Sequence, residues 1–234
     1  MSTATKGTAG YDRRRELQAF DDTKAGVKGL VDAGVTTILP IFHHPPDSLA
    51  TSSTATIPVI DLSGRRSEVV GEVRAATETV GFFQVVNHDV PADLLAEMVA
   101  SVRRFHESPA EAKTPHYTRD LAKKKRSVWV DVPPVPGALV INVGDLLQLV
   151  SNGRLKSVEH RVVANRSRDR ARISVAAFFN ADLRTTTAVY GPIEEQVSSS
   201  APPLYRSITV GEFLSHYDGK GLDGRPALDH FLLP

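Results

Sequence analysis

The chain has 234 residues, of which 41% are hydrophobic and 24% charged, and its net charge is +1. This composition is typical of a globular protein of one large or two small domains, and the small net charge gives no reason to expect nucleic acid or an anionic membrane as a partner. The absence of cysteine excludes disulfides, thiolate metal ligands and cysteine nucleophiles. No apolar run could span a bilayer, and the N-terminus lacks an apolar signal core, so we expect a cytoplasmic protein.

The first half of the chain has an α/β pattern. Residues 1–10 are small and polar, which predicts disorder. Apolar residues recur at helical spacing over 12–33, Gly34 predicts the end of that helix, and prolines between 35 and 56 predict an extended arm. The pattern then predicts a strand at 57–62, a helix at 66–80, a strand at 81–87 and a helix from Pro91 to about Phe105.

The second half changes to short strands separated by turns rich in proline, glycine and asparagine, which indicates antiparallel β-structure. The predicted strands lie at 127–131, 138–142, 146–150, 158–164 and 171–179. After residue 180 the pattern is irregular, and it predicts one last helix at Val210–Tyr217.

The predicted hairpin at 157–174 carries the residues of greatest chemical interest. A histidine in a strand, such as His160, is more often structural than catalytic. However, Arg172 and Ser174 share one face of the following strand, because side chains two apart in a strand point the same way. A guanidinium binds a carboxylate through two parallel hydrogen bonds, and a serine hydroxyl can add a third. The hairpin therefore predicts a metal-binding imidazole beside a site for a diacid.

Seven segments together resemble the plant 2-oxoglutarate- and iron(II)-dependent dioxygenases, and among them the branch of 1-aminocyclopropane-1-carboxylate oxidase homologues. These segments are Phe20–Gly34, Ile41–Pro45, Ile57–Asp61, Gly81–His88, Gly137–Leu149, Ser157–Val162 and Arg172–Ser174. The resemblance implies an α+β protein with an incomplete double-stranded β-helix (jelly roll), an α/β N-terminal extension and a C-terminal helix. The expected ranges are 11–126 for the extension, 127–182 for the jelly-roll remnant and 183–234 for the C-terminal loop and helix.

The resemblance also implies the roles of the hairpin residues. His160 corresponds to the distal iron ligand, and Arg172 and Ser174 correspond to the residues that hold 2-oxoglutarate. The implied cofactors are Fe(II) and 2-oxoglutarate, with ascorbate as a further candidate. The family reaction is the oxidation, by hydroxylation or desaturation, of a small specialised metabolite.

The other two iron ligands of the family, a His-x-Asp pair on an earlier strand, are missing. Among the eight histidines only His216-Tyr217-Asp218 has this spacing. It follows His160 and falls on the last predicted helix, where side chains two apart point about 200° away from each other. An eight-stranded jelly roll needs about 80–95 residues, whereas residues 127–180 suffice for about five strands. The sequence therefore predicts an internal deletion at the join Lys125–Ser127.

Three functions remain open. The first is a truncated dioxygenase that has no catalytic activity by itself and retains iron poorly. The second is a non-catalytic binding or regulatory pseudoenzyme that pairs with full-length relatives. The third is residual activity on a small-molecule substrate through a rebuilt site. In each case the lost strands leave open sheet edges, so we expect low solubility of the isolated chain.

Overall fold

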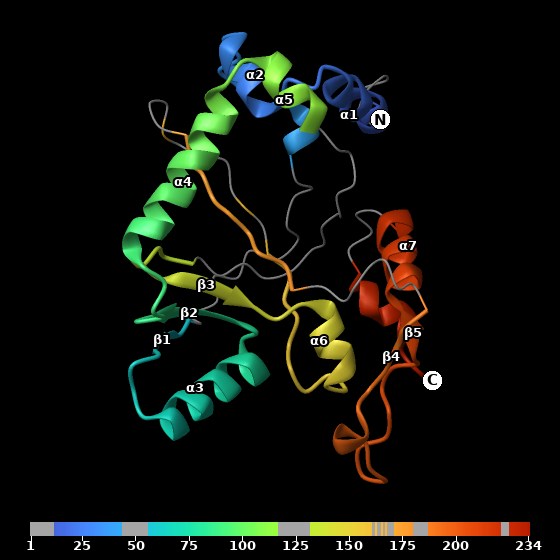
Figure 1. The fold of residues 1–234 in the computed structure, drawn as a ribbon. Coiled ribbons are helices and arrows are strands. Elements are labelled where there is room, and N and C mark those ends of the chain that lie inside the picture. Colours follow the sequence, from blue (N-terminus) through green and yellow to red (C-terminus); the bar gives the residue numbers. More distant parts are fainter. Residues whose placement is uncertain are drawn as a thin grey trace, which may run out of the picture. The chain divides into compact units, whose positions relative to one another are not determined.

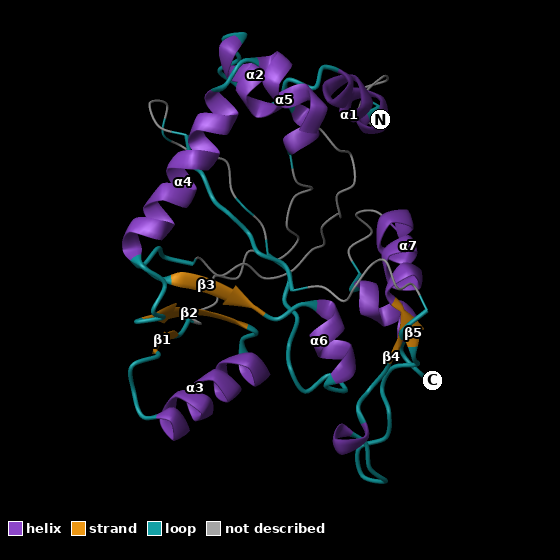
Figure 2. Cartoon of the chain, viewed as in Figure 1, coloured by secondary structure: helices purple, strands orange, loops and turns teal. Residues whose placement is uncertain are grey.

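The computed structural model describes residues 12–43, 56–116, 132–160, 162, 165, 167, 171–179, 187–220 and 225–234 (Figures 1 and 2). These residues form two compact units. One takes its described residues from Met1–Pro46 and Met98–Leu121, the other from Asp47–Glu97 and Ala122–Pro234. The predicted disorder at 1–10, the predicted strand at 127–131 and the join at Lys125–Ser127 lie outside the described residues.

The first unit is helical. Its elements are α1 (Arg13–Asp22), α2 (Gly26–Asp32), a 3₁₀ turn at Pro40–Phe42, the end of α4 (Ala92–Glu107), α5 (Ala110–Lys113) and a second 3₁₀ turn at Thr114–His116. The prediction of a single helix over 12–33 is wrong in one respect. Lys24 and Gly26 adopt φ of 51° and 60°, so the segment forms two helices. The predicted stop is confirmed, since Gly34 has φ of 73° and its N–H donates to the carbonyl of Val31.

The second unit contains a three-stranded sheet, as the α/β pattern predicts. Its elements are β1 (Val59–Asp61), α3 (Arg66–Thr79), β2 (Phe82–Val86) and β3 (Leu139–Asn142), with the strand order β1-β2-β3. β1 runs parallel to β2, and β3 runs antiparallel to it. Helix α3 lies along one face of this sheet (Figure 1). The buried residues between the helix and the sheet are Ile60, Ala76, Phe83 and Val85.

A second core lies around α6 (Asp145–Val150). Further elements are β4 (Val189–Tyr190), a 3₁₀ turn at Glu194–Gln196, β5 (Ile208–Thr209), α7 (Val210–Lys220) and a 3₁₀ segment at Ala227–Phe231. The buried residues of this core are Leu149, Tyr205, Ile208, Leu228 and Phe231. Helix α7 confirms the predicted last helix. No helix among the described residues is long and apolar enough to cross a membrane.

Three strand predictions in the second half are wrong for the residues that the structure describes. The apolar run 146–150 forms helix α6, because a short apolar run does not distinguish a buried strand from a buried helix. Asn152 and Gly153, with φ of 54° and 75°, end that helix in a left-handed turn. The hairpin strands were predicted at 158–164 and 171–179. Residues 158–160 and 171–179 have no strand structure. A strand needs a hydrogen-bonded neighbour, and no described strand pairs with either segment.

Candidate functional site

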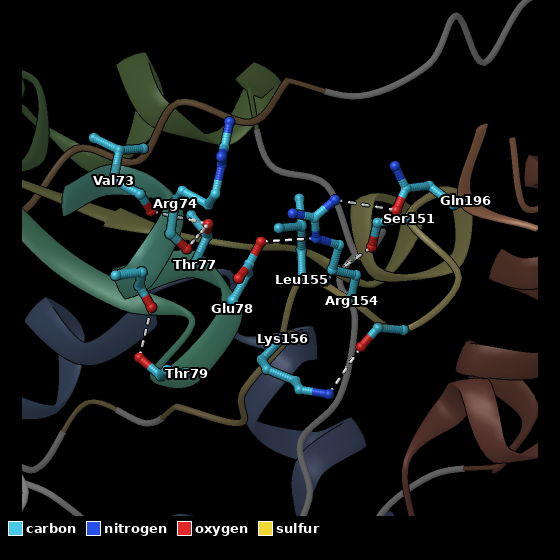
Figure 3. Close-up of polar contacts among 12 residues, drawn as sticks. Val73, Arg74, Thr77, Glu78, Thr79, Ser151, Arg154, Leu155, Lys156 and Gln196 are labelled. Carbon is cyan, nitrogen blue, oxygen red and sulfur yellow. Dashed lines mark hydrogen bonds and ion pairs between the residues drawn. The ribbon is translucent and has the colours of Figure 1, made fainter. Parts of the chain in front are cut away.

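The segment that leads to His160 is held against α3 and α6 (Figure 3). The Nε of Arg154 lies 2.7 Å from the Oε1 of Glu78, and the backbone N–H of Lys156 donates to the carbonyl of Thr77 at 2.9 Å. Gly81 permits this approach, since a Cβ at that position would lie 1.9 Å from the carbonyl oxygen of Lys156. This contact explains why glycine follows α3, and it anchors the chain just before the candidate ligand.

His160 lies at the end of this anchored segment, with its side chain exposed. The ring centroid is 5.7 Å from that of Phe82 on β2, and the ring Nδ1 is 3.3 Å from the carbonyl oxygen of Val158. The Nδ1–H tautomer makes this contact a hydrogen bond and leaves Nε2 as the nitrogen able to ligate a metal. The environment of His160 is therefore compatible with a ligand role, but the imidazole supplies only one donor atom for a metal.

Arg172 and Ser174 lie on the same side of their segment, where the Nη1 of Arg172 donates to the Oγ of Ser174 at 3.0 Å. Both side chains are exposed. Among the described residues, no hydrogen bond or ring contact links His160 to either of them. The structure thus brings together the two residues expected to hold a carboxylate, and their role in binding 2-oxoglutarate stays a prediction.

The described residues do not fit the iron site that the sequence resemblance implies. No group of three His, Cys, Asp or Glu side chains among them could hold a metal ion. His216 lies within α7 as expected, and its ring stacks on that of His230 with centroids 4.0 Å apart and planes 9° apart. This stacking gives His216 a packing role against Phe231, which both rings meet edge-on.

A polar cluster at the carboxyl ends of β1 and β2 has a structural explanation. Asp61 Oδ1 accepts hydrogen bonds from the Nδ2 of Asn87 at 2.8 Å and from the N–H and Oγ of Ser63 at 2.9 and 2.7 Å. These bonds, that from Asn87 first, hold the pKa of Asp61 below its ordinary value. Next to it, the Nε2 of His88 lies 2.8 Å from the carbonyl oxygen of Gly137. The cluster ties the turn after β2 to the turn before β3.

Sequence reasoning missed a groove of about 480 Å³ between α3 and α6. Its walls are mainly apolar, with Val73 from α3 and Leu147 and Val150 from α6. Arg154 and Glu78, which pair with each other, also line it. The groove depends on residues 145–150 being a helix, so a strand prediction there could not reveal it.

Comparisons with known proteins agree with the sequence resemblance. The family model described as "non-haem dioxygenase in morphine synthesis N-terminal" matches residues 57–128, and that of the "2OG-Fe(II) oxygenase superfamily" matches residues 114–181. Homologue 3 of 1-aminocyclopropane-1-carboxylate oxidase from Arabidopsis thaliana is 31% identical, over 94% of this chain and 97% of its own. Homologue 1 from the same plant is 32% identical, over 97% and 99%.

Solved structures share the fold. The structure of JOX2 in complex with 2OG, Fe and JA has a TM-score of 0.66 at 18% identity, covering 89% of this chain and 97% of that one. The dioxygenase for auxin oxidation in rice has a TM-score of 0.57 at 20% identity, covering 76% and 100%. Both have the jelly-roll fold of 2-oxoglutarate oxygenases, and the described sheets of this chain, with three and two strands, form an incomplete version of it.

The alignment to homologue 3 extends over 359 positions, whereas this chain has 234 residues, so more than a hundred aligned positions have no counterpart here. The two family matches overlap at 114–128, which is where the predicted join lies. The alignments reach 97% and 99% of the relatives' own lengths, at 31% and 32% identity. The chain belongs to the plant 2-oxoglutarate- and Fe(II)-dependent oxygenases, in the branch of the 1-aminocyclopropane-1-carboxylate oxidase homologues.

Proposed function

We propose that this chain is a truncated dioxygenase that does not turn over 2-oxoglutarate by itself. The observation that supports this most strongly is the ligand set. The family site takes two imidazoles and a carboxylate, and the one His-x-Asp sequence in the chain lies in α7, at positions that point to different sides of a helix. Ligand number and geometry determine how firmly iron is held, so one imidazole at His160 retains it weakly.

The residues that remain are suited to binding an anion rather than to catalysis. The guanidinium of Arg172 and the hydroxyl of Ser174, 3.0 Å apart, present donors in the arrangement that a carboxylate accepts. In the family, bound iron supplies the activation of oxygen. Because the described donors do not hold iron in the family geometry, no reaction step is assigned to this chain.

The test is to load the purified full chain with Fe(II) under anaerobic conditions and to measure bound iron and, after adding oxygen and 2-oxoglutarate, succinate. We expect substoichiometric iron and no succinate above background, with a full-length relative as the positive control. His160→Ala should lower the bound iron further and leave succinate at background. One iron per chain together with succinate release that His160→Ala abolishes would contradict the proposal and would favour a rebuilt site.

The origin of the truncation has its own test. Transcript sequencing across codons 120–130 reads the join directly. A transcript that runs from Arg126 to Ser127 without interruption supports a real deletion. A transcript with an intervening segment that encodes His-x-Asp refutes the deletion, and ordinary dioxygenase activity then follows for the longer product.

A second candidate is a non-catalytic partner of full-length relatives, acting in the cytoplasm. The observation that favours it is the retention of the N-terminal α/β sheet, in which α3 packs on β1 and β2 around a buried cluster. A surface carried by that sheet survives even if the iron site does not. Co-purification of the tagged chain with a co-expressed full-length relative tests this role, and recovery of the tagged chain alone argues against it.

A further inference from the structure

Strand β3 forms one edge of the three-stranded sheet, and its outer side has a defined hydrogen-bonding pattern. In the β2–β3 pair, Phe83 stands opposite Ile141, and beyond the strand end the N–H of Val143 donates to the carbonyl of Gly81 at 2.9 Å. Backbone groups in an antiparallel strand alternate between its two sides. Residues 139, 141 and 143 therefore point their N–H and C=O groups toward β2, and Val140 and Asn142 point theirs outward.

In the part of the chain that the structure describes, this outer edge has none of the devices that protect a strand from pairing. Among the described residues, no backbone hydrogen bond reaches the outward groups of Val140 or Asn142. Strand β3 contains no charged residue and no proline, and the side chains of Val140 and Ile141 are 50% and 37% exposed. The opposite edge strand, β1, follows Pro58 and ends in Asp61, and both residue types discourage edge pairing.

The edge is complementary to itself in one register. A two-fold axis perpendicular to the sheet makes two β3 strands antiparallel, and facing residues must then project from the same face. Placing Ile141 opposite Ile141 of a second copy satisfies this condition and sets Val140 opposite Asn142 on both sides. All outward N–H and C=O groups of Val140 and Asn142 are then paired, which gives four hydrogen bonds. The central pair is apolar, and each copy covers an exposed side chain of the other.

We propose that two copies of this chain associate through β3, antiparallel and in the register that brings Ile141 against Ile141. The second copy is the occupant that this edge specifies, because one strand supplies both the donors and the acceptors that the other needs. The pairing uses the sheet alone and does not rest on the proposed loss of catalysis. The proposed pairing predicts defined dimers. Open edges without a preferred register would instead produce disordered aggregates.

The absence of cysteine from the sequence allows a direct test of the register. Facing residues that are not hydrogen-bonded have Cα atoms about 4.5 Å apart, which lies within the range of about 4.4–6.8 Å that a disulfide spans. Ile141→Cys, as the single cysteine in the chain, should therefore form a disulfide-linked dimer on mild oxidation. Val70→Cys, at a 46% exposed apolar position on α3, is the matched control and should give at least several-fold less. Equal cross-linking of the two variants would overturn the proposal, even if the wild-type chain aggregates.

Light scattering after size-exclusion chromatography tests the association itself. The wild-type chain should have the mass of a dimer, and Ile141→Lys should have that of a monomer, because two ammonium groups would face each other at the central pair. Thermal melts of both proteins check that the substitution leaves the fold intact. A wild-type monomer at every concentration tested would overturn the proposal, and so would an Ile141→Lys variant that folds and remains a dimer.

Discussion

The segments 154–157 and 171–179 differ in how the described part of the chain holds them. The first is anchored by other elements, and no described backbone hydrogen bond anchors the second. Arg154 pairs with Glu78, Lys156 bonds to α3 and approaches Gly81, and the N–H of Ser157 donates to the Oε1 of Gln148 at 2.6 Å. In the second segment Phe178 and Phe179 are 78% and 101% exposed. The partners of the first segment lie on α3 and α6 and in the turn between α3 and β2. The second segment has a strand pattern, but no described strand pairs with it.

The two segments show that a sequence adopts its expected structure only where the contacts for that structure are present. Helices α3 and α6 satisfy their own backbone groups, so they need neighbours only for side-chain packing. A strand must also find its hydrogen bonds on another strand. The internal deletion that we propose would therefore affect the predicted hairpin around the candidate site more than it affects the α/β sheet.

The largest effect is expected in the core next to the anchored segment. Leu149 on α6 is fully buried, so Leu149→Ala should lower the free energy of unfolding by about 3–5 kcal/mol through lost burial and a residual cavity. Phe179→Ala, in the exposed segment, should change it by less than about 0.5 kcal/mol. Urea unfolding followed by circular dichroism measures both. A large loss in Phe179→Ala would show that the second segment is packed, and the comparison would fail.

The close approach of Gly81 to Lys156 gives the next effect. Gly81→Ala should cost about 2–4 kcal/mol, because it combines a positive φ of 71° with a clash against the carbonyl of Lys156. Gly137→Ala is the matched control, since its φ is 77° but a Cβ there meets nothing within 4 Å, and it should cost about 1–2 kcal/mol. Urea unfolding of the two variants tests this. Equal losses would mean that the segment 154–157 moves aside freely.

A smaller effect is expected where β2 holds the segment before β3. Gln84 is 1% exposed, its Nε2 donates to the carbonyl of Pro133 at 3.1 Å, and its Oε1 accepts from the N–H of Val135 at 3.3 Å. Gln84→Met keeps the volume but removes both bonds, so it should cost about 1–2 kcal/mol. Gln18→Met, at an exposed position on α1, should cost less than about 0.5 kcal/mol. Thermal unfolding of both variants measures the difference, and a neutral Gln84→Met would remove this anchor from the comparison.

The smallest effect concerns pH. The pKa of Asp61 is lowered in the folded chain by hydrogen bonds from Asn87 and Ser63, so its carboxylate contributes stability above its ordinary pKa. That contribution is lost as the pH falls from about 4 to below the lowered pKa. Between pH 6 and pH 3 the Tm of Asp61→Asn should therefore fall by less than the Tm of the wild type, because the other carboxylates are the same in both proteins. Glu72→Gln, on the exposed side of α3, is the control, and an identical pH profile for wild type and Asp61→Asn would refute the link.

Periodicity and turn residues predicted much of the fold. The amphipathic spacing of 66–80, the strand at 81–87 and the helix that begins after Pro91 appear as α3, β2 and α4 within a residue or two. The family resemblance, carried by motifs at both ends of the chain, agrees with the comparisons. The strand pattern placed Arg172 and Ser174 on one side of their segment, and the hydrogen bond between them agrees, although the segment has no strand structure. These features depend on local sequence, and local sequence is intact.

Other features depend on contacts between residues far apart in the chain. Residues 145–150 form a helix because Leu149 is buried with Phe231, far along the chain, and a short apolar run carries no record of that contact. The same helix creates the groove beside α3. Whether the segments around His160 and Arg172 form strands depends on neighbours that spacing alone cannot supply. The sequence thus determined the family and the identity of the candidate ligands, and the pairing partners present in the folded chain decided how much of the site those residues could build.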